Sequence, residues 1–247
     1  MASRTTPRSR RKPSARSSDA VPSRRERGTR GLFLTFEGID GCGKTTQLNL
    51  LSDYLARLGL PYLVTREPGG TELGEQIRKI LLRRASVGMD PRNELLLYFA
   101  SRAQNVAQVI RPALAEGLTV LCDRFTDASL AFQGYGRGLD LRFIRRLHSF
   151  ACQEVNPDLT FVLDIRPETS VKRARKRNLS ARHDEGRFEQ EALAFHQRVR
   201  RGYRALARLE PRRVKLIPAE DDIDTIHQKV VALARPLLAR LPRRTRP

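Results

Sequence analysis

The sequence is short of the features that mark membrane, secreted and metal-binding proteins. No apolar run in it approaches the roughly 20 residues that a membrane-spanning helix needs, and its N-terminus lacks the apolar core of a secretory signal. The three cysteines are odd in number and lack the paired spacing of metal or redox sites, and the four histidines show no ligand spacing either. We therefore expect a soluble, cytoplasmic protein with reduced thiols and no membrane partner.

Acidic residues are scarce at both ends of the chain. The net charge is +20, of which residues 1–30 carry +8 and residues 235–247 carry +5, so that only +7 remains for the 204 residues between. Neither tail contains an aromatic residue, which argues against a surface that stacks single-stranded nucleic acid. We expect a disordered basic tail over 1–30, a basic tail over 239–247 and no specific nucleic-acid partner. Three interpretations stay open for the tail over 1–30. It is a transit peptide, it binds polyanions without specificity, or the translation start is placed too far upstream.

One stretch carries a phosphate-binding pattern. Gly38, Gly43, Lys44 and Thr45 match G-x-x-x-x-G-K-[ST], between a strand-like apolar run and a leucine-rich helical pattern. The glycines let backbone N–H groups turn inward around phosphate oxygens, the lysine adds a mobile charge and the hydroxyl is placed to hold Mg²⁺. A chance match somewhere in such a chain has a probability of about one percent. The sequence therefore predicts a nucleoside-triphosphate site.

The 247 residues, 40% of them apolar, suffice for one large α/β domain. Apolar runs predict five strands, at 31–36, 61–66, 118–124, 159–165 and 213–217. Helical patterns predict helices over 45–59, 92–116 and 223–238. They also predict a short helix that ends at about 82 and two helices that begin at about 167 and about 188. Strands that alternate with helices predict a parallel five-stranded sheet with helices on both faces, and ligands at the carboxyl ends of its strands.

Five separated segments resemble those of bacterial thymidylate kinases, in the same order and at matching intervals. They are EGIDGCGKTTQ, TREPGGTELGEQIRKILL, LLLYFASRAQ, DRFTDASLAFQGYGRGL and PDLTFVLDIRPETSVKRARKR. The resemblance implies a P-loop kinase fold over 31–238 with a short lid at about 175–188. It also implies transfer of the γ-phosphoryl group of ATP to dTMP with Mg²⁺, which gives dTDP and ADP, and a homodimer.

The resemblance assigns the phosphate loop to ATP. The implied ATP-binding residues are Gly38, Ile39, Asp40, Gly41, Cys42, Gly43, Lys44, Thr45 and Thr46. Thr45 and Asp123 are the implied metal ligands. Catalytic roles fall to Lys44, Asp40, Arg124 and Arg177, with Asp40 holding the 3′-hydroxyl of the deoxyribose.

A second group of residues is assigned by resemblance to the acceptor nucleotide. It comprises Arg66, Glu67, Arg78, Tyr98, Arg102, Arg124, Ser129, Phe132 and Gln133. Arginine forks at strand ends suit the acceptor's phosphate. Tyr98 would stack on the thymine, Arg102 would bind a base edge from the same helical face, and Phe132 would exclude a ribose 2′-hydroxyl. Without the resemblance, Tyr98 would be interpreted as filling the core beneath an apolar helix.

The chain departs from the family pattern at a few positions. Phe125, Ala128 and Phe132 stand where the family usually has hydroxyl-bearing residues, and Gly41 stands where some members place an arginine. The cation that neutralises the charge of the transferring phosphoryl group is therefore expected from the lid. The lid candidates are Arg173, Arg177, Arg182 and Arg187, with Arg177 as first choice.

Other functions stay open at this point. A kinase of the same fold for another pyrimidine monophosphate shares the phosphate loop, but Tyr98, Ser129 and Phe132 favour thymine on deoxyribose. A nucleic-acid-binding NTPase would account for the basic tails and predicts strongly salt-dependent stimulation by DNA or RNA. A non-catalytic nucleotide binder is disfavoured because Lys44 and Asp123 are both present.

Overall fold

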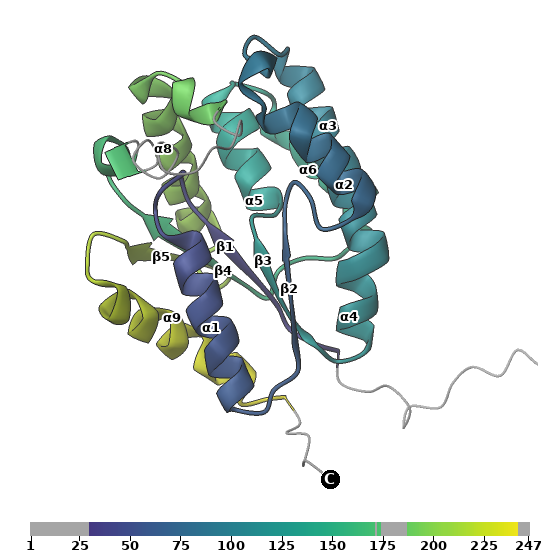
Figure 1. Cartoon of the computed structure of the whole chain (residues 1–247), viewed down its shortest axis with the longest axis vertical. Coiled ribbons are helices and arrows are strands. Elements are labelled where there is room, and N and C mark those ends of the chain that lie inside the picture. Colours follow the sequence, from purple (N-terminus) through teal and green to yellow (C-terminus); the bar gives the residue numbers. More distant parts are fainter. Residues whose placement is uncertain (1–29, 171, 174–186, 242–247) are drawn as a thin grey trace, which may run out of the picture.

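The computed structural model describes residues 30–170, 172–173 and 187–241. Its core is a five-stranded parallel sheet of order β2-β3-β1-β4-β5, which confirms the predicted fold class (Figure 1). The strands are β1 (Phe33–Glu37), β2 (Tyr62–Arg66), β3 (Thr119–Asp123), β4 (Leu159–Asp164) and β5 (Val214–Pro218). Residues 1–29 and 242–247 of the predicted tails, and 175–186 of the predicted lid, lie outside the described residues.

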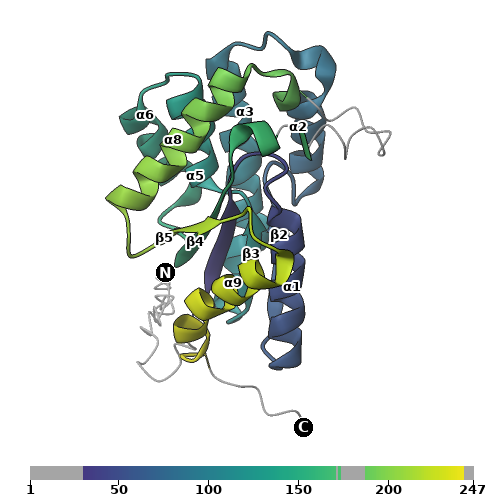
Figure 2. The same ribbon diagram turned by 90° about the vertical axis from the view of Figure 1, so that its left-hand side faces the viewer.

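Helices cover both faces of the sheet, with α1 and α9 on one face and α3, α4, α6 and α8 on the other (Figures 1 and 2). Their bounds are α1 (Lys44–Arg57), α2 (Glu72–Leu82), α3 (Pro91–Asn105), α4 (Arg111–Ala115), α5 (Thr126–Ser129), α6 (Leu141–Cys152), α8 (Leu193–Leu209) and α9 (Ile223–Leu238). Another helix begins at Pro167, as predicted. Within the described ranges, no helix combines the length and apolarity needed to cross a bilayer.

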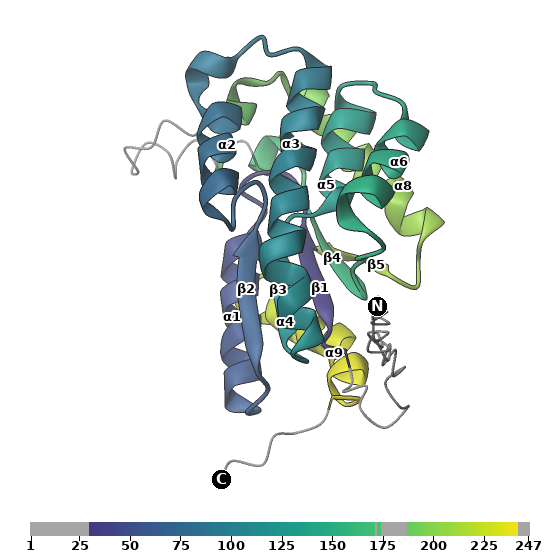
Figure 3. The ribbon, with the colours of Figure 1, turned by 90° about the vertical axis from the view of Figure 1, so that its right-hand side faces the viewer.

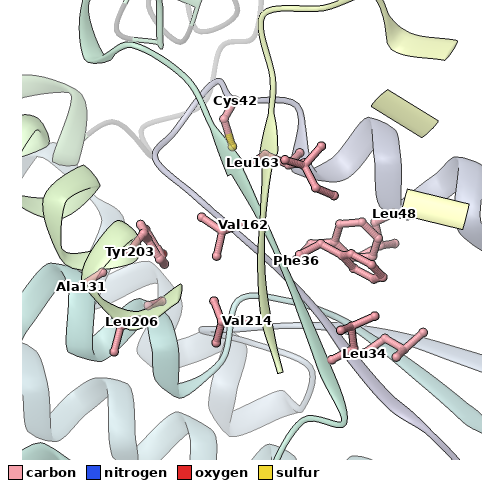
Figure 4. Packing of buried hydrophobic residues seen from close by; sticks show 14 of the residues in the cluster. Leu34, Phe36, Cys42, Leu48, Ala131, Val162, Leu163, Tyr203, Leu206 and Val214 are labelled. Carbon is pink, nitrogen blue, oxygen red and sulfur yellow. The ribbon is translucent and has the colours of Figure 1, made fainter. Parts of the chain in front are cut away.

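Side chains of β1 alternate between two apolar layers, as the period of a strand requires. Leu34 and Phe36 belong to a cluster with Leu48 and Leu51 of α1, whereas Phe33 packs with Ile110 beside α4. Figure 4 shows Leu34, Phe36 and Leu48 on one side of the strands and Tyr203 and Leu206 of α8 on the other. β1 is therefore buried at every position, including those of Thr35 and Glu37.

The predicted single helix over 92–116 is wrong in its middle. A π-helical turn, η2 (Val106–Ile110), separates α3 from α4. Pro112 lies at the start of α4, where its ring would clash with the carbonyl group of residue 108 in an unbroken α-helix. The wider turn relieves that clash, and the segment continues in nearly the same direction (Figure 3).

The helix predicted from about 188 begins later. Phe188–Gln190 forms a separate 3-10 turn, η4, and the extended backbone of Glu191 and Ala192 delays α8 to Leu193. Helix α6 had no predicted bounds, although Asp140 is a standard cap whose side chain accepts a hydrogen bond from the N–H of Arg142. A π-helical turn before it, η3 (Leu130–Gly136), was not predicted either.

Candidate active site

A cavity of about 1080 Å³ opens at the carboxyl ends of the strands. Its walls come from the loops after β1, β2 and β3, from α2, and from the segment that precedes α8. The predicted site residues that border it are Asp40, Gly41, Gly43, Lys44, Thr45, Thr46, Arg66, Glu67, Arg78, Asp123, Arg124, Arg173 and Arg187. Residues far apart in the sequence are thus brought together at one edge of the sheet, as predicted from its topology.

The loop after β1 needs glycine at defined positions. Gly38 has φ of 134°, and a Cβ there would lie 2.7 Å from the carbonyl oxygen of Leu163. Gly43 has φ of 100° and forms the left-handed N-cap of α1. Lys44 is 8% exposed and its Nζ lies 3.4 Å from the carbonyl oxygens of Gly38 and Ile39. These contacts are long, so the ammonium group is held near the loop without being saturated.

Two residues of the loop can meet a ligand only through their backbone. The side chains of Ile39 and Cys42 are buried in the main apolar cluster, and burial raises the pKa of the Cys42 thiol. Their backbone amides remain part of the loop that surrounds the cavity. The loop is therefore anchored from below by apolar packing while its polar atoms face the site.

Thr45 and Asp123 form the part of the site that suits a divalent cation. The Thr45 hydroxyl donates to Asp123 Oδ2 at 3.3 Å, and both residues border the cavity. Across the described ranges, no cluster of three or more His, Cys, Asp or Glu side chains forms a complete metal cage. One hydroxyl and one carboxylate fit Mg²⁺, which commonly keeps several waters and takes its other oxygen ligands from phosphates.

Arg124 is held in a left-handed backbone conformation, with φ of 73°, directly after β3. Such a conformation in a non-glycine residue is typical of functional sites. The guanidinium donates to the Gly38 carbonyl oxygen at 2.9 Å and to Asp40 Oδ1 at 2.6 Å. Burial alone would raise the pKa of Asp40, but attraction to Arg124 and Lys44 outweighs it and lowers that pKa to about 2. Asp40 is therefore a carboxylate at neutral pH, able to accept but not to donate hydrogen bonds.

Glu37 supports this turn from below, a role that was not predicted. Its Oε1 accepts hydrogen bonds from the N–H groups of Phe125 (2.7 Å) and Ala128 (3.2 Å), and its Oε2 accepts one from the Tyr203 hydroxyl (2.7 Å). Glu37 is fully buried, and burial together with repulsion from Asp127 raises its pKa to about 7. The only sequence signal was a glutamate at the end of an apolar strand.

Two arginines, one at the end of β2 and one on α2, border the cavity. Arg66 Nη2 lies 2.9 Å from Glu75 Oε2, on the exposed side of the site. Arg78 of α2 donates from Nη1 to the carbonyl oxygen of Pro68 at 3.0 Å. The Glu67–Pro68 peptide bond between them is cis. Both residues border the cavity, and their binding of an acceptor's phosphate stays a prediction.

Glu67 and Arg102 form a buried ion pair. Arg102 is fully buried, its Nε lies 2.6 Å from Glu67 Oε2, and it also donates to Ser129 Oγ and to the carbonyl oxygen of Phe125, both at 3.0 Å. Its guanidinium lies over the Phe99 ring, 4.6 Å from the centroid. Arg102 therefore orders the protein interior here, and its contact with a base edge stays a prediction.

The other residues predicted to meet the base lie behind the cavity wall. Phe132 packs edge-to-face on Phe188, with 5.4 Å between ring centroids, and Gln133 donates to Glu94 Oε1 at 2.7 Å. Tyr98 is half-buried on α3, and burial together with the nearby Glu94 carboxylate raises the pKa of its hydroxyl. Phe188 itself borders the cavity, so it forms the wall on this side.

The described lid candidates occupy different settings. Arg173 is exposed and donates to the carbonyl oxygen of Ala219 at 3.5 Å. The Arg187 side chain is 2% exposed and its Nη2 lies 2.8 Å from Glu94 Oε2. Arg177 and Arg182 lie outside the described residues.

Sequence reasoning also missed Glu94 and Arg137. Glu94 is a fully buried carboxylate that faces Gln133, Arg137 and Arg187. The available signal was a single charge in an otherwise apolar helical stretch, NELLLYF. Such a residue is buried only with partners.

Known proteins resemble this chain over most of its length. A family model described as Thymidylate kinase matches residues 36–230. The thymidylate kinase of Syntrophotalea carbinolica is 52% identical over 199 residues, which are 80% of this chain and 92% of that protein. That of Geobacter sulfurreducens is 49% identical over 215 residues, 87% of this chain and 100% of that protein. The crystal structure of thymidylate kinase from Ehrlichia chaffeensis has a TM-score of 0.66 and 34% identity, covering 83% of this chain and 98% of that one.

Proposed function

The chain belongs to the thymidylate kinase family, and from this premise we propose how its residues carry out the reaction. The enzyme phosphorylates dTMP to dTDP at the expense of ATP. The observation that carries the proposal is the meeting of three features in one cavity: the phosphate loop, the Thr45–Asp123 pair and the arginines of β2, α2 and β3.

The phosphates of ATP bind to the loop over residues 38–46. Inward-facing N–H groups and the N-terminus of α1 supply fixed partial charges. Lys44 leaves its long contacts with the Gly38 and Ile39 carbonyl oxygens and donates to the outer phosphates instead. Because these groups are already in place, little reorganisation is needed when charge develops on the transferring group.

Thr45 and Asp123 would hold Mg²⁺, which would offset the negative charge of the phosphates when bound. The hydroxyl and the carboxylate lie 3.3 Å apart at the cavity wall, which supports this assignment. The protein's contribution is to place them beside Lys44, at the end of β3 and the start of α1. No further protein ligand is needed for this cation.

The acceptor's phosphate binds between Arg66, Arg78 and Arg124, and Asp40 accepts the 3′-hydroxyl of its sugar. The 2.6 Å contact between Arg124 and Asp40 supports this pairing, because it fixes the phosphate and hydroxyl sites relative to each other. Glu67 acts through Arg102 in this proposal, since both are buried.

The base is assigned to the side of the cavity that Phe188 borders, next to the residues named for it. Tyr98 stacks on the thymine, and Ser129, Phe132 and Gln133 contact its edge and the sugar. Arg102 uses three of its five N–H groups on Glu67, Ser129 and Phe125, which leaves two donors for the base edge. A kinase of the same fold for another pyrimidine monophosphate is the second candidate, because it would share the phosphate loop and the arginines at the strand ends.

The cation that offsets the transition-state charge is assigned to the lid. Arg187 is paired with Glu94, and Arg173 is directed to the Ala219 carbonyl oxygen. These engagements support Arg177 as the first choice, with Arg182 behind it. The lid over 175–188 belongs, in this proposal, to a kinase domain over 31–238, with the basic tails outside it.

A homodimer is proposed through α3 and α6, which pack side by side (Figure 3). These helices expose Leu96 (52%), Phe143 (43%) and Phe150 (83%). Phe150→Arg should convert the dimer to a monomer in size-exclusion chromatography with light scattering. Leu209→Arg is the matched control, because Leu209 is 66% exposed at the end of α8. A dimer that survives Phe150→Arg would contradict this interface.

A cytoplasmic location is also proposed. All three cysteines are free thiols buried in the protein, which suits a reducing compartment. Neither a membrane partner nor a specific nucleic-acid partner is part of the proposal.

The experiment that tests the proposed function is a coupled assay of ADP formation with ATP and Mg²⁺. The acceptors are dTMP, dUMP, the ribose form of TMP, dCMP and dGMP, and the protein is used both as the full chain and starting at Gly31. Turnover mainly with dTMP, equal in both proteins, is the expected result. ATP hydrolysis indifferent to every monophosphate would contradict it.

A further inference from the structure

Glu94 is a fully buried carboxylate surrounded by side-chain N–H groups. Its Oε1 accepts from Gln133 Nε2 at 2.7 Å and from Arg137 Nε at 3.4 Å. Its Oε2 lies 3.1 Å from Arg137 Nη2 and 2.8 Å from Arg187 Nη2. Removing this carboxylate would leave two guanidinium groups without their shared counter-charge.

The cluster joins three segments that are remote in the sequence. Glu94 lies on α3, Gln133 and Arg137 lie on or just after η3, and Arg187 precedes α8. Arg137 also donates to Glu191 Oε1 at 2.5 Å, so that two carboxylates balance two guanidinium groups. The guanidinium carbons of Arg137 and Arg187 lie 5.8 and 4.5 Å from the centroid of the Phe188 ring.

Arg187 lies at the cavity wall, and part of the hydrogen-bonding capacity of its guanidinium is unused among the described residues. The residue borders the cavity although its side chain is only 2% exposed. Its Nη2 is close to Glu94, yet within the described part of the chain neither its Nε nor its Nη2 has an aligned hydrogen-bond partner. Buried N–H groups without acceptors are costly, so donors left open at a cavity wall suit a ligand oxygen.

The hydrogen bond to Gln133 has a consequence for the base. A carboxylate can only accept, so the Gln133 amide must direct its nitrogen to Glu94. Its carbonyl oxygen is then the end free to accept a hydrogen bond. Among the common pyrimidines, thymine and uracil carry an N–H donor at ring position 3, whereas cytosine carries an acceptor there. An oriented glutamine oxygen therefore favours thymine or uracil.

We infer that Glu94 is a positioning residue of the acceptor site, which fixes the Gln133 amide and the Arg187 guanidinium for recognition of the acceptor nucleotide. This inference rests on the proposed function, since it takes the acceptor to bind on this side of the cavity. Glu94 touches no substrate. It acts through Gln133 and Arg187, and its loss should weaken acceptor binding more than it slows phosphoryl transfer.

The test compares two carboxylate-to-amide substitutions, Glu94→Gln and Asp127→Asn. Asp127 is the matched control, because it is 3% exposed and pairs with Arg213 through contacts of 2.6 and 2.9 Å. That pair also contacts Thr160, at the amino ends of β4 and β5 and so away from the cavity. Measured quantities are kcat, the KM for dTMP and for ATP, the Kd of dTMP by calorimetry, and the thermal midpoint.

Glu94→Gln should raise the KM and Kd of dTMP about tenfold or more, with the KM for ATP within about twofold. Both substitutions should lower the thermal midpoint by similar amounts. Asp127→Asn should leave the KM and the Kd of dTMP within about twofold of the wild-type values. Equal effects of the two substitutions on dTMP binding would mean that Glu94 is merely structural, and would overturn the inference.

A double-mutant cycle with Arg187→Met tests the coupling directly. Because Glu94 acts in part through Arg187, the double variant should lose less dTMP affinity than the sum of the two single losses. Fully additive losses would contradict that coupling. The wild type is also titrated with every monophosphate of the acceptor panel. If the wild type prefers another acceptor, the proposed preference for dTMP is wrong. The double-mutant cycle is then measured with that acceptor, and its result still decides the role of Glu94.

Discussion

The two sides of the cavity are built in different ways. The phosphate side consists of backbone groups, strand ends and a few side chains that project from rigid elements, among them Lys44, Asp123 and Arg124. The base side consists of buried charges from remote segments, centred on Glu94 and on the Glu67–Arg102 pair.

This difference has a functional meaning. Groups on the phosphate side border the cavity, and in the proposed mechanism they face the place where charge develops, so they are expected to act mainly on the rate. Groups on the base side are largely buried and act through their neighbours, so they are expected to act mainly on acceptor affinity. Substitutions can separate these two contributions.

Lys44→Ala should give the largest effect, a fall in kcat of about 10³-fold or more, because a preorganised cation is lost from the outer phosphates. Steady-state assays with dTMP measure it. Lys79→Ala, at an exposed position of α2, is the control and should retain full activity. A kcat that stays within tenfold in Lys44→Ala would remove this lysine from the mechanism.

Arg177→Ala should lower kcat by roughly 10³-fold while changing ATP affinity less, if this lid arginine offsets the transition-state charge. Arg187→Ala is the variant to compare with it, because the Arg187 guanidinium is paired with Glu94 in the wild type. That variant should raise the KM for dTMP more than it lowers kcat. The reverse pattern in the two variants would exchange their assigned roles.

Arg124→Lys should lower kcat/KM for dTMP about a hundredfold. A lysine keeps the charge but cannot reach the Gly38 carbonyl oxygen and Asp40 with one planar fork. Arg212→Lys, before β5 and exposed, is the control. Unchanged kinetics in Arg124→Lys would show that charge alone suffices at this position.

Glu37→Gln should have the smallest effect on activity and a distinct effect on stability. The pKa of Glu37 is raised from 4.5 to about 7, so the folded state binds a proton more tightly than the unfolded state. The stability from this proton is fully present below about pH 4.5 and is lost as the pH rises through about 7.

Urea unfolding of both proteins at about pH 5 and about pH 7.5 measures this loss. The free energy of unfolding of the variant, relative to the wild type, should rise by roughly 2 kcal/mol between those pH values. An unchanged difference between the proteins would mean that Glu37 keeps an ordinary pKa.

The two sides also differ in how far the sequence predicts them. The phosphate loop was predictable because its requirements are local: glycines with positive φ at Gly38 and Gly43, then a lysine and a hydroxyl at the start of a helix. The sheet was predictable for a similar reason, since each buried strand is a short apolar run between turn signals.

The Glu94 cluster was not predictable from any local pattern. Its partners Gln133 and Arg137 lie 39 and 43 residues away, and Arg187 is further still. Arg102 and Arg187 are buried because tertiary packing supplies their counter-charges, Glu67 and Glu94. The π turn before Pro112 was missed although its cause is local, since the proline ring clashes within an unbroken α-helix. The late start of α8 follows from the extended backbone of Glu191 and Ala192.

The most direct test of the division between rate and affinity is calorimetric titration of dTMP into Lys44→Ala and Glu94→Gln beside their steady-state kinetics. Lys44→Ala should bind dTMP within about threefold of the wild type and yet turn over at least about 10³-fold more slowly. Glu94→Gln should bind dTMP about tenfold more weakly and keep kcat within about threefold at saturation. Weak dTMP binding in Lys44→Ala together with a low saturated rate in Glu94→Gln would contradict the account.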